Sequence, residues 1–143
     1  MKKTVRILAF TLVFVMLAMT LASCGAPKSD PDEAKKALEK NGYTVLKTNG
    51  YLSNLGAAIL GTESNVDASI SAYKEVEDKD GNKTSEVLFI IYYKTEAAAK
   101  EAWEDAKKDA EDAKKDSGSS DWVVNRSGKM IYYGTKAAVK AAS

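Results

Sequence analysis

Residues 86–93 read Glu-Val-Leu-Phe-Ile-Ile-Tyr-Tyr, a run that is almost wholly apolar and rich in β-branched and aromatic side chains. Such side chains fit a pleated sheet well. The apolar residues do not alternate with polar ones, which is typical of a strand covered on both faces. The run therefore predicts a central strand, and the neighbouring stretches are interpreted around it.

The stretch before this run predicts its partner strand. Apolar residues alternate with polar ones from Val66 to Tyr73, which indicates a strand with one buried face. Residues 78–84 contain Asp80-Gly81 and predict a hairpin loop between the two strands. This acidic loop lacks the ligand spacing of an EF-hand calcium site, so we predict no metal site there.

A long helix and a second pair of strands follow the central run. Thr95 is a candidate cap for a helix that extends to about Asp116, because alanines and Trp103 recur on one stripe at spacings of three and four. Residues 121–125 and 129–133 predict two strands, and a short helix follows them.

One ten-residue pattern occurs twice. Residues 91–100 and 131–140 are identical at seven of ten positions, at an offset of 40. Each copy combines a strand end, a threonine and a helix start, so we predict that Thr95 and Thr135 both cap helices. The strands upstream of the two copies align poorly, and both duplication and convergence on one turn chemistry stay open.

The N-terminal side of the domain predicts two more helices and a strand. Asp30-Pro31 marks the start of a helix, with Asp30 as N-cap, and Asn41-Gly42 marks its end. A short strand at 43–47 follows. Residues 51–60 carry apolar side chains at helical spacing and predict a short helix.

From residue 43 the predicted order is strand, helix, strand, strand, helix, strand. This order matches the ferredoxin-like βαββαβ arrangement. We therefore predict an α+β fold, with an antiparallel sheet of four to five strands, helices packed on one face, and an N-terminal helix in front. A different order of strands within the sheet stays open.

The composition excludes much catalytic chemistry. The chain has one cysteine and no histidine, so it contains no Ser-His-Asp triad, no Cys-His pair and no imidazole zinc site. It also lacks a glycine-rich phosphate loop. We predict a protein that is not an enzyme and uses no cofactor or metal. A hydrolase that acts through carboxylates or a serine-lysine pair stays open, and it ranks third after a binding module and a structural protein.

The chain begins with a targeting segment. Three basic residues precede an apolar run at 7–22, which at about 1.5 Å per residue reaches only ~24 Å and is short for a membrane span. The run ends in Leu21-Ala22-Ser23-Cys24, which resembles the lipobox of bacterial lipoproteins. The resemblance implies cleavage between Ser23 and Cys24, and a diacylglyceryl thioether on the cysteine sulfur. Whether a third acyl chain modifies the amino group stays open.

Cleavage after residue 23 of 143 leaves 120 residues, enough for one domain. We predict a signal peptide at 1–23, a lipidated tether at 24–30 and a single α+β domain at 31–143. Three of the 21 basic residues lie in the leader, so 18 basic side chains face 20 acidic ones, a net charge of −2. This balance argues against a nucleic-acid partner. The predicted location is the extracytoplasmic side of the cell membrane, held there by diacylglyceryl-Cys24.

Five aromatic residues form a candidate ligand surface: Tyr92, Tyr93, Trp122, Tyr132 and Tyr133. Adjacent tyrosines of a strand point to opposite faces, so one of each pair is expected in the core and the other on an uncovered face. An exposed aromatic surface can stack on sugar rings or contact a protein. Core packing is the simpler interpretation of the same residues.

The leading hypothesis is a lipid-anchored extracytoplasmic module that binds a protein or carbohydrate partner. The alternative is a structural cell-envelope protein without a small ligand. A pocket lined by Tyr92 or Tyr132 would favour the first, a flat polar second face of the sheet would favour the alternative, and two facing carboxylates would favour the hydrolase.

Overall fold

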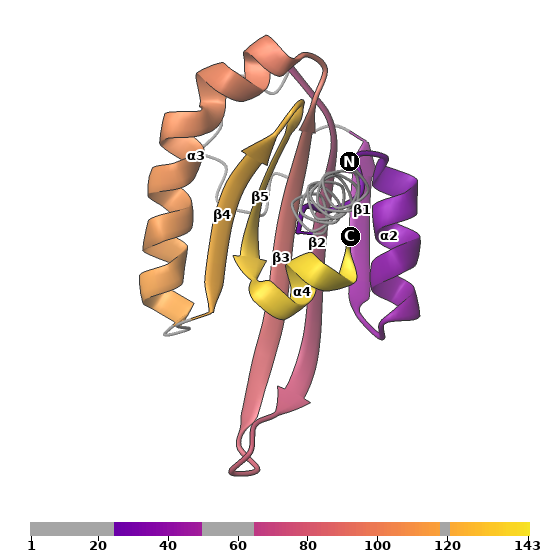
Figure 1. Cartoon of the computed structure of the whole chain (residues 1–143), viewed down its shortest axis with the longest axis vertical. Coiled ribbons are helices and arrows are strands. Elements are labelled where there is room, and N and C mark those ends of the chain that lie inside the picture. The colour runs from indigo at the N-terminus through magenta and orange to yellow at the C-terminus, as the bar shows by residue number, and fades with distance from the viewer. Residues whose placement is uncertain (1–24, 50–64, 118–120) are drawn as a thin grey trace, which may run out of the picture.

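The computed structural model describes residues 25–49, 65–117 and 121–143 (Figure 1). The elements in chain order are α2 (Pro31–Lys40), β1 (Thr44–Asn49), β2 (Val66–Glu77), β3 (Lys83–Tyr93), α3 (Glu96–Ser117), β4 (Trp122–Ser127), β5 (Met130–Thr135) and α4 (Lys136–Ala141). The predicted N-terminal, long and C-terminal helices and all five predicted strands are confirmed. The predicted helix at 51–60 lies outside the described residues.

The five strands form one antiparallel sheet in the order β1-β2-β3-β5-β4. β3 lies at the centre, as the apolar run at 86–93 predicts. It pairs with β2 from Glu77↔Lys83 at the turn to Val66↔Tyr93 at the far end. This β2–β3 hairpin projects well beyond the other strands (Figure 1).

The ferredoxin-like order is not seen among the described strands. That order needs βαβ units, in which a crossover helix joins parallel strands. Here β1 lies at an edge of the sheet and runs antiparallel to β2. At the other side β5, not β4, pairs with β3, and β4 forms the second edge.

The prediction that the helices pack on one face of the sheet is wrong. α2 and α4 cover one face, where Leu38 and Val139 belong to the same core cluster as Ile90 of β3. α3 covers the other face, where Ala106 belongs to a second cluster with Ile91. Successive strand residues point to opposite faces, and β3 is apolar on both, so each face needs its own cover. We call the two sides the α4 face and the α3 face.

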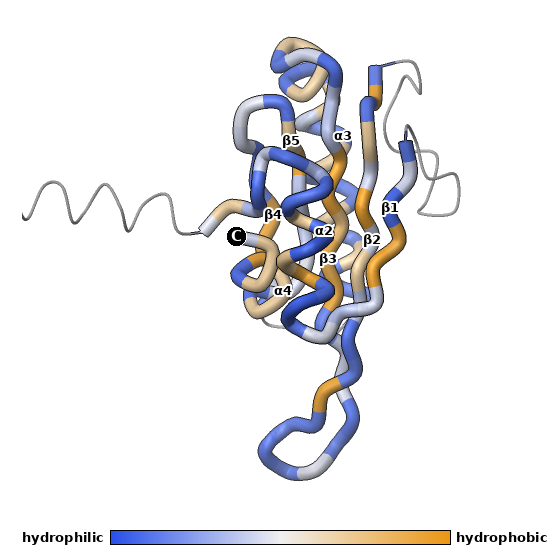
Figure 2. The backbone as a smooth tube through the Cα atoms, turned by 90° about the vertical axis from the view of Figure 1, so that its right-hand side faces the viewer, coloured by the Kyte–Doolittle hydropathy of each residue, from blue (hydrophilic) through white to orange (hydrophobic). Residues whose placement is uncertain are grey.

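The segment before α2 lies against the fold. Ala26 packs on the core cluster of the α4 face, and Pro27 is buried. The Lys28 N–H donates to the Ala142 carbonyl at 2.8 Å, and the Tyr92 hydroxyl donates to the Lys28 carbonyl at 2.9 Å. Residues 26–28, which belong to the predicted tether at 24–30, therefore pack on the fold, and we call them the docked segment. Its start lies beside the C-terminal end of the chain (Figure 2).

The start of α2 is fixed by its cap. The Asp30 carboxylate accepts hydrogen bonds from the backbone N–H groups of Asp32 at 2.8 Å and Glu33 at 3.0 Å. These bonds satisfy donors that have no partner within the helix, as the sequence predicts.

Of the helices described, none is long and apolar enough to cross a membrane.

Candidate functional site

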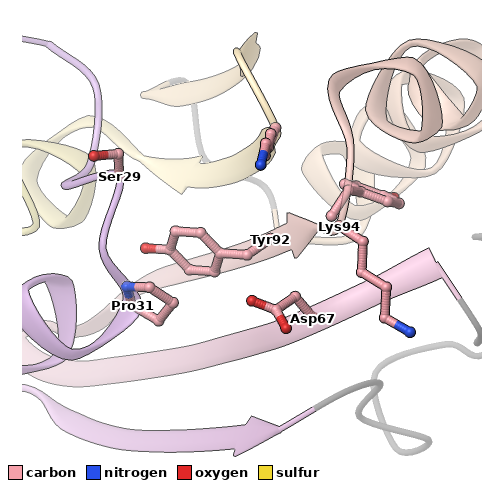
Figure 3. Close-up of a pocket in the computed structure, with 7 residues that line it drawn as sticks. Ser29, Pro31, Asp67, Tyr92 and Lys94 are labelled. Carbon is pink, nitrogen blue, oxygen red and sulfur yellow. The ribbon is translucent and has the colours of Figure 1, made fainter.

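A pocket of about 340 Å³ opens where β2 begins and β3 ends, next to the docked segment (Figure 3). We call it the Tyr92 pocket. Its lining combines two aromatic rings, two lysines, one carboxylate and a short polar turn: Ser29, Pro31, Asp67, Tyr92, Tyr93, Lys94 and Lys129.

Backbone hydrogen bonds hold the walls of this pocket together. The Tyr93 N–H donates to the Lys129 carbonyl at 2.7 Å, which joins the end of β3 to the turn between β4 and β5. The Lys94 N–H donates to the Asn65 carbonyl at 2.9 Å, which joins the same end to the start of β2. The site is therefore built on paired strand ends, which position side chains more firmly than a free loop does.

Tyr92 forms the side of the pocket that faces the docked segment. Its ring crosses the pocket and its hydroxyl points toward Ser29 and Pro31 (Figure 3). Burial raises the pKa of this hydroxyl, and the nearby Asp30 charge raises it further. Tyr92 is thus a neutral hydrogen-bond donor at neutral pH, and the Lys28 carbonyl uses that donor.

The charges of the pocket come from its rim. Lys94, Lys129 and Asp67 are all exposed. Figure 3 shows Lys94 extending along the side opposite Pro31, with the Asp67 carboxylate between them. The lining carries two ammonium groups and one carboxylate, while the Asp30 charge lies near the Tyr92 hydroxyl at the other side. An anionic ligand is therefore favoured at the side of Lys94 and Lys129.

A second hollow of about 800 Å³ lies between the projecting hairpin and the ends of β4 and β5. We call it the hairpin groove. Trp122 lines this groove. Its ring also belongs to a row of three aromatic rings, in which the centroid of Tyr133 lies 6.2 Å from that of Trp122 and 5.1 Å from that of Phe89. Within the described part of the chain, the buried Trp122 Nε1 has no hydrogen-bond acceptor.

The carboxylates of the hairpin groove are engaged elsewhere. Glu86 accepts a hydrogen bond from the Tyr43 hydroxyl. Asp78 accepts from the Asn82 and Asp80 N–H groups of the hairpin turn, and these bonds lower the pKa of its carboxyl group. Asp121 forms an ion pair with Lys136 at 3.5 Å. None of the three is arranged as a general acid or base, so the groove gives no support to the hydrolase hypothesis.

The five predicted aromatic residues do not form one surface. All four tyrosines are buried, at 3–6% exposure, so neither pair presents an exposed ring. Tyr92 and Tyr93 line the Tyr92 pocket, and Trp122 lines the hairpin groove. Tyr132 and Tyr133 belong to the packed sheet and line neither. Ser23 and Cys24 lie outside the described residues.

Sequence reasoning missed the polar residues of the Tyr92 pocket, namely Ser29, Asp67, Lys94 and Lys129. Asp67, Lys94 and Lys129 each lie at or beside the end of a predicted strand. The predicted hairpin could have placed Asp67 near Tyr92, but the position of Lys129 beside them depends on the pairing of β3 with β5.

In the described part of the chain, no group of three or more acidic, cysteine or histidine residues is arranged to hold a metal ion.

Comparison of the whole chain with known protein families, with curated proteins and with solved structures found no match. The geometry of the two hollows and the N-terminal sequence are therefore the grounds for a functional conclusion.

Proposed function

We propose that this protein is a lipid-anchored extracytoplasmic bacterial lipoprotein that acts as a non-enzymatic binding module. The leader, its length and the Leu21-Ala22-Ser23-Cys24 sequence support the anchor. In this proposal Cys24 carries the diacylglyceryl group and becomes the first residue of the processed chain. Two buried acyl chains hold a protein at a bilayer, whereas a single chain gives only marginal binding.

The observation that carries the binding role is that Tyr92 and Tyr93 line an open pocket with Lys94 and Lys129. Its volume of about 340 Å³ falls within the range of small-ligand sites. Charged residues from three strand ends border this hollow, and this supports a binding module over a structural protein without a ligand.

The chemistry of the rim favours a small anionic ligand, such as an acidic sugar or the acidic end of a protein partner. Stacking of a sugar ring over Tyr92 is disfavoured, because that side chain is only 5% exposed. Recognition would then come from the lysine ammonium groups and the polar turn at Ser29.

The anchor is tested by Cys24→Ala in the full chain. We expect this variant to lose labelling by radioactive palmitate. It should also keep its leader, so that its mass is that of the uncleaved chain without lipid. Ser23→Ala is the matched control, because it keeps a small residue before the cysteine and should be processed normally. Normal labelling and membrane retention of Cys24→Ala would refute the anchor.

The pocket is tested with a leaderless form that begins at Gly25, because residues 26–28 pack on the fold and must be kept. The unfolding temperature of this form is measured alone and with each of three probes: glucuronate and an acidic dipeptide, which are anionic, and glucose, which is the neutral control. We expect an anionic probe to raise the unfolding temperature of the wild type, and Lys94→Ala with Lys129→Ala to remove that shift. Lys108→Ala, an exposed lysine of α3, should retain it. A shift that survives loss of both rim lysines would exclude this pocket as the site.

A further inference from the structure

We propose that the α4 face of the domain lies against the lipid bilayer and that the α3 face points away from it. This inference rests on the proposed anchor at Cys24. The partner of the α4 face is the surface of the same membrane that holds the lipid.

The first step is that the docked segment fixes where the chain leaves the fold. Ala26 packs on the core of the α4 face and Pro27 is buried. Lys28 is held on both sides, by Ala142 through its N–H and by Tyr92 through its carbonyl. Gly25, the residue directly before the docked segment, is exposed.

The second step is covalent reach. Consecutive Cα atoms are about 3.8 Å apart, so the Cα atom of Cys24 lies within ~8 Å of that of Ala26. A free tether of seven residues would span up to ~24 Å and would leave the domain able to turn in any direction. With residues 26–28 docked, the acyl chains must enter the bilayer beside the α4 face.

The third step is the charge near the exit point. Lys28 is exposed, and its backbone is bonded to Ala142, directly after α4. α4 carries the exposed Lys136 and Lys140 and no acidic residue. Lys136 is paired with Asp121, and α2 on the same face carries Asp32 and Glu33. Among the described residues, the unpaired basic charge beside the exit point therefore comes from Lys28 and Lys140. Basic side chains close to an anionic leaflet are attracted to its headgroups.

The α3 face has the opposite placement. α3 packs on the other side of the sheet from the docked segment, as the two separate core clusters demonstrate. Its exposed lysines, such as Lys108, are therefore separated from the anchor by the sheet and by the helix itself, which alone is about 10 Å across.

The chain offers a clean way to test this orientation. The chain has one cysteine, and in the proposed anchor the lipid occupies its sulfur, so a cysteine introduced elsewhere would be the one free thiol. Lys140→Cys on α4 and Lys108→Cys on α3 remove the same charge from exposed helical positions. Each full-chain, lipidated variant is labelled with a fluorophore and placed in vesicles of phosphatidylcholine and phosphatidylglycerol that contain a headgroup nitroxide quencher.

We expect the label at position 140 to be quenched at least about twofold more than that at position 108, because a headgroup quencher does not reach across a helix ~10 Å wide and a sheet. Insertion of a long glycine-serine linker between Gly25 and Ala26 should reduce this difference, because the domain is then free to rotate. Equal quenching at the two positions, or stronger quenching at 108, would overturn the proposed orientation.

Vesicle flotation separates this result from a failure of the anchor. If the wild type floats with the vesicles and the two labels are quenched equally, the orientation is wrong and the anchor stands. If the wild type does not float, the anchor is wrong, and the orientation that rests on it is wrong as well.

Discussion

Thr95 and Thr135 occupy the same position in the repeated ten-residue pattern, yet their hydroxyl groups make different bonds. The Thr95 hydroxyl accepts from the Ala98 N–H at 3.1 Å, which is the predicted capping bond of α3. Thr135 occupies the N-cap position of α4 but makes no side-chain cap bond. Its hydroxyl accepts from the Val87 N–H at 3.2 Å and donates to the Val87 carbonyl at 3.3 Å. The predicted cap is therefore confirmed for Thr95 and wrong for the side chain of Thr135.

The residue before each threonine explains the difference. Lys94 stands in the first copy and Gly134 in the second. Gly134 pairs with Leu88 of β3, and an added Cβ atom there would lie 2.2 Å from the Val87 carbonyl oxygen. Glycine thus lets β5 approach β3 closely enough for Thr135 to reach Val87.

Replacement of Gly134 by alanine should destabilise the domain. The added methyl group would overlap backbone atoms that cannot rotate away, and overpacking of this kind costs about 1–3 kcal/mol. Urea unfolding of the form that begins at Gly25 measures the effect. Gly25→Ala is the control, because nothing lies within 4 Å of its added Cβ atom. Equal unfolding midpoints for Gly134→Ala and the wild type would contradict this account of the close approach.

At the scale of the element, α3 is defined by its small side chains. Ala99 and Ala106 are fully buried in the core cluster that α3 forms with the sheet, with the partly buried Trp103 beside them, and Ala110 is fully buried as well. Small residues on one stripe let the backbone of a helix come close to its neighbour. The predicted alanine stripe with Trp103 as its large member is confirmed.

A larger side chain on this stripe should push α3 away from the sheet. We expect Ala106→Leu to destabilise the domain by about 1–3 kcal/mol, because Ala106 has no exposed surface and no room for three more carbons. Ala97→Leu on the exposed side of the same helix should change stability little. Chemical denaturation of the two variants gives the comparison, and a loss of similar size in both would point to helix propensity instead of packing.

The sequence determines the elements better than their arrangement. Periodicity located β2 and β3, but both strands extend further into the hairpin than predicted, to Glu77 and from Lys83. Apart from the partly buried Val76, that extension is polar and most of it is exposed, so no repeating hydrophobic pattern marks it. The two-sided cover of β3 was visible in residues 86–93, whereas the strand order depends on pairings between distant segments, such as β3 with β5.

The candidate site was harder to predict for the same reason. The Tyr92 pocket draws on residues near positions 29, 67, 93 and 129, which no local pattern connects. The docking of residues 26–28 depends on single contacts with Ala142 and Tyr92. Small and polar residues before a helix predict a free tether equally well until those partners are placed.

For the whole molecule, buried tyrosines predict a loss of stability in alkali. Burial raises the pKa of Tyr43, Tyr92 and Tyr132, and hydrogen bonding to Glu86 adds to the effect at Tyr43. In the unfolded chain a tyrosine ionises near pH 10. The stabilising contribution of the neutral hydroxyls is therefore complete below about pH 10 and is lost as the pH rises above it.

We expect the urea midpoint of the wild type to fall between pH 9 and pH 11, and that of Tyr92→Phe to fall less steeply. At pH 8 this variant should be less stable by about 0.5–1.5 kcal/mol, the usual contribution of one hydrogen bond. The difference should narrow as the pH increases. Tyr73→Phe, at a side chain that is 52% exposed, should keep the wild-type slope. A constant difference between Tyr92→Phe and the wild type would contradict the linkage.

The hydrogen bond between Lys28 and Ala142 also means that the N-terminal and C-terminal ends of the domain lie close together, so the chain can be circularly permuted. Because these two residues touch, a few added glycines could join the ends of the leaderless domain without strain. New ends could then be opened in the exposed turn at Asp80-Gly81, which lines neither hollow. Such a circularly permuted protein should fold to the same sheet, with its termini carried on the tip of the projecting hairpin.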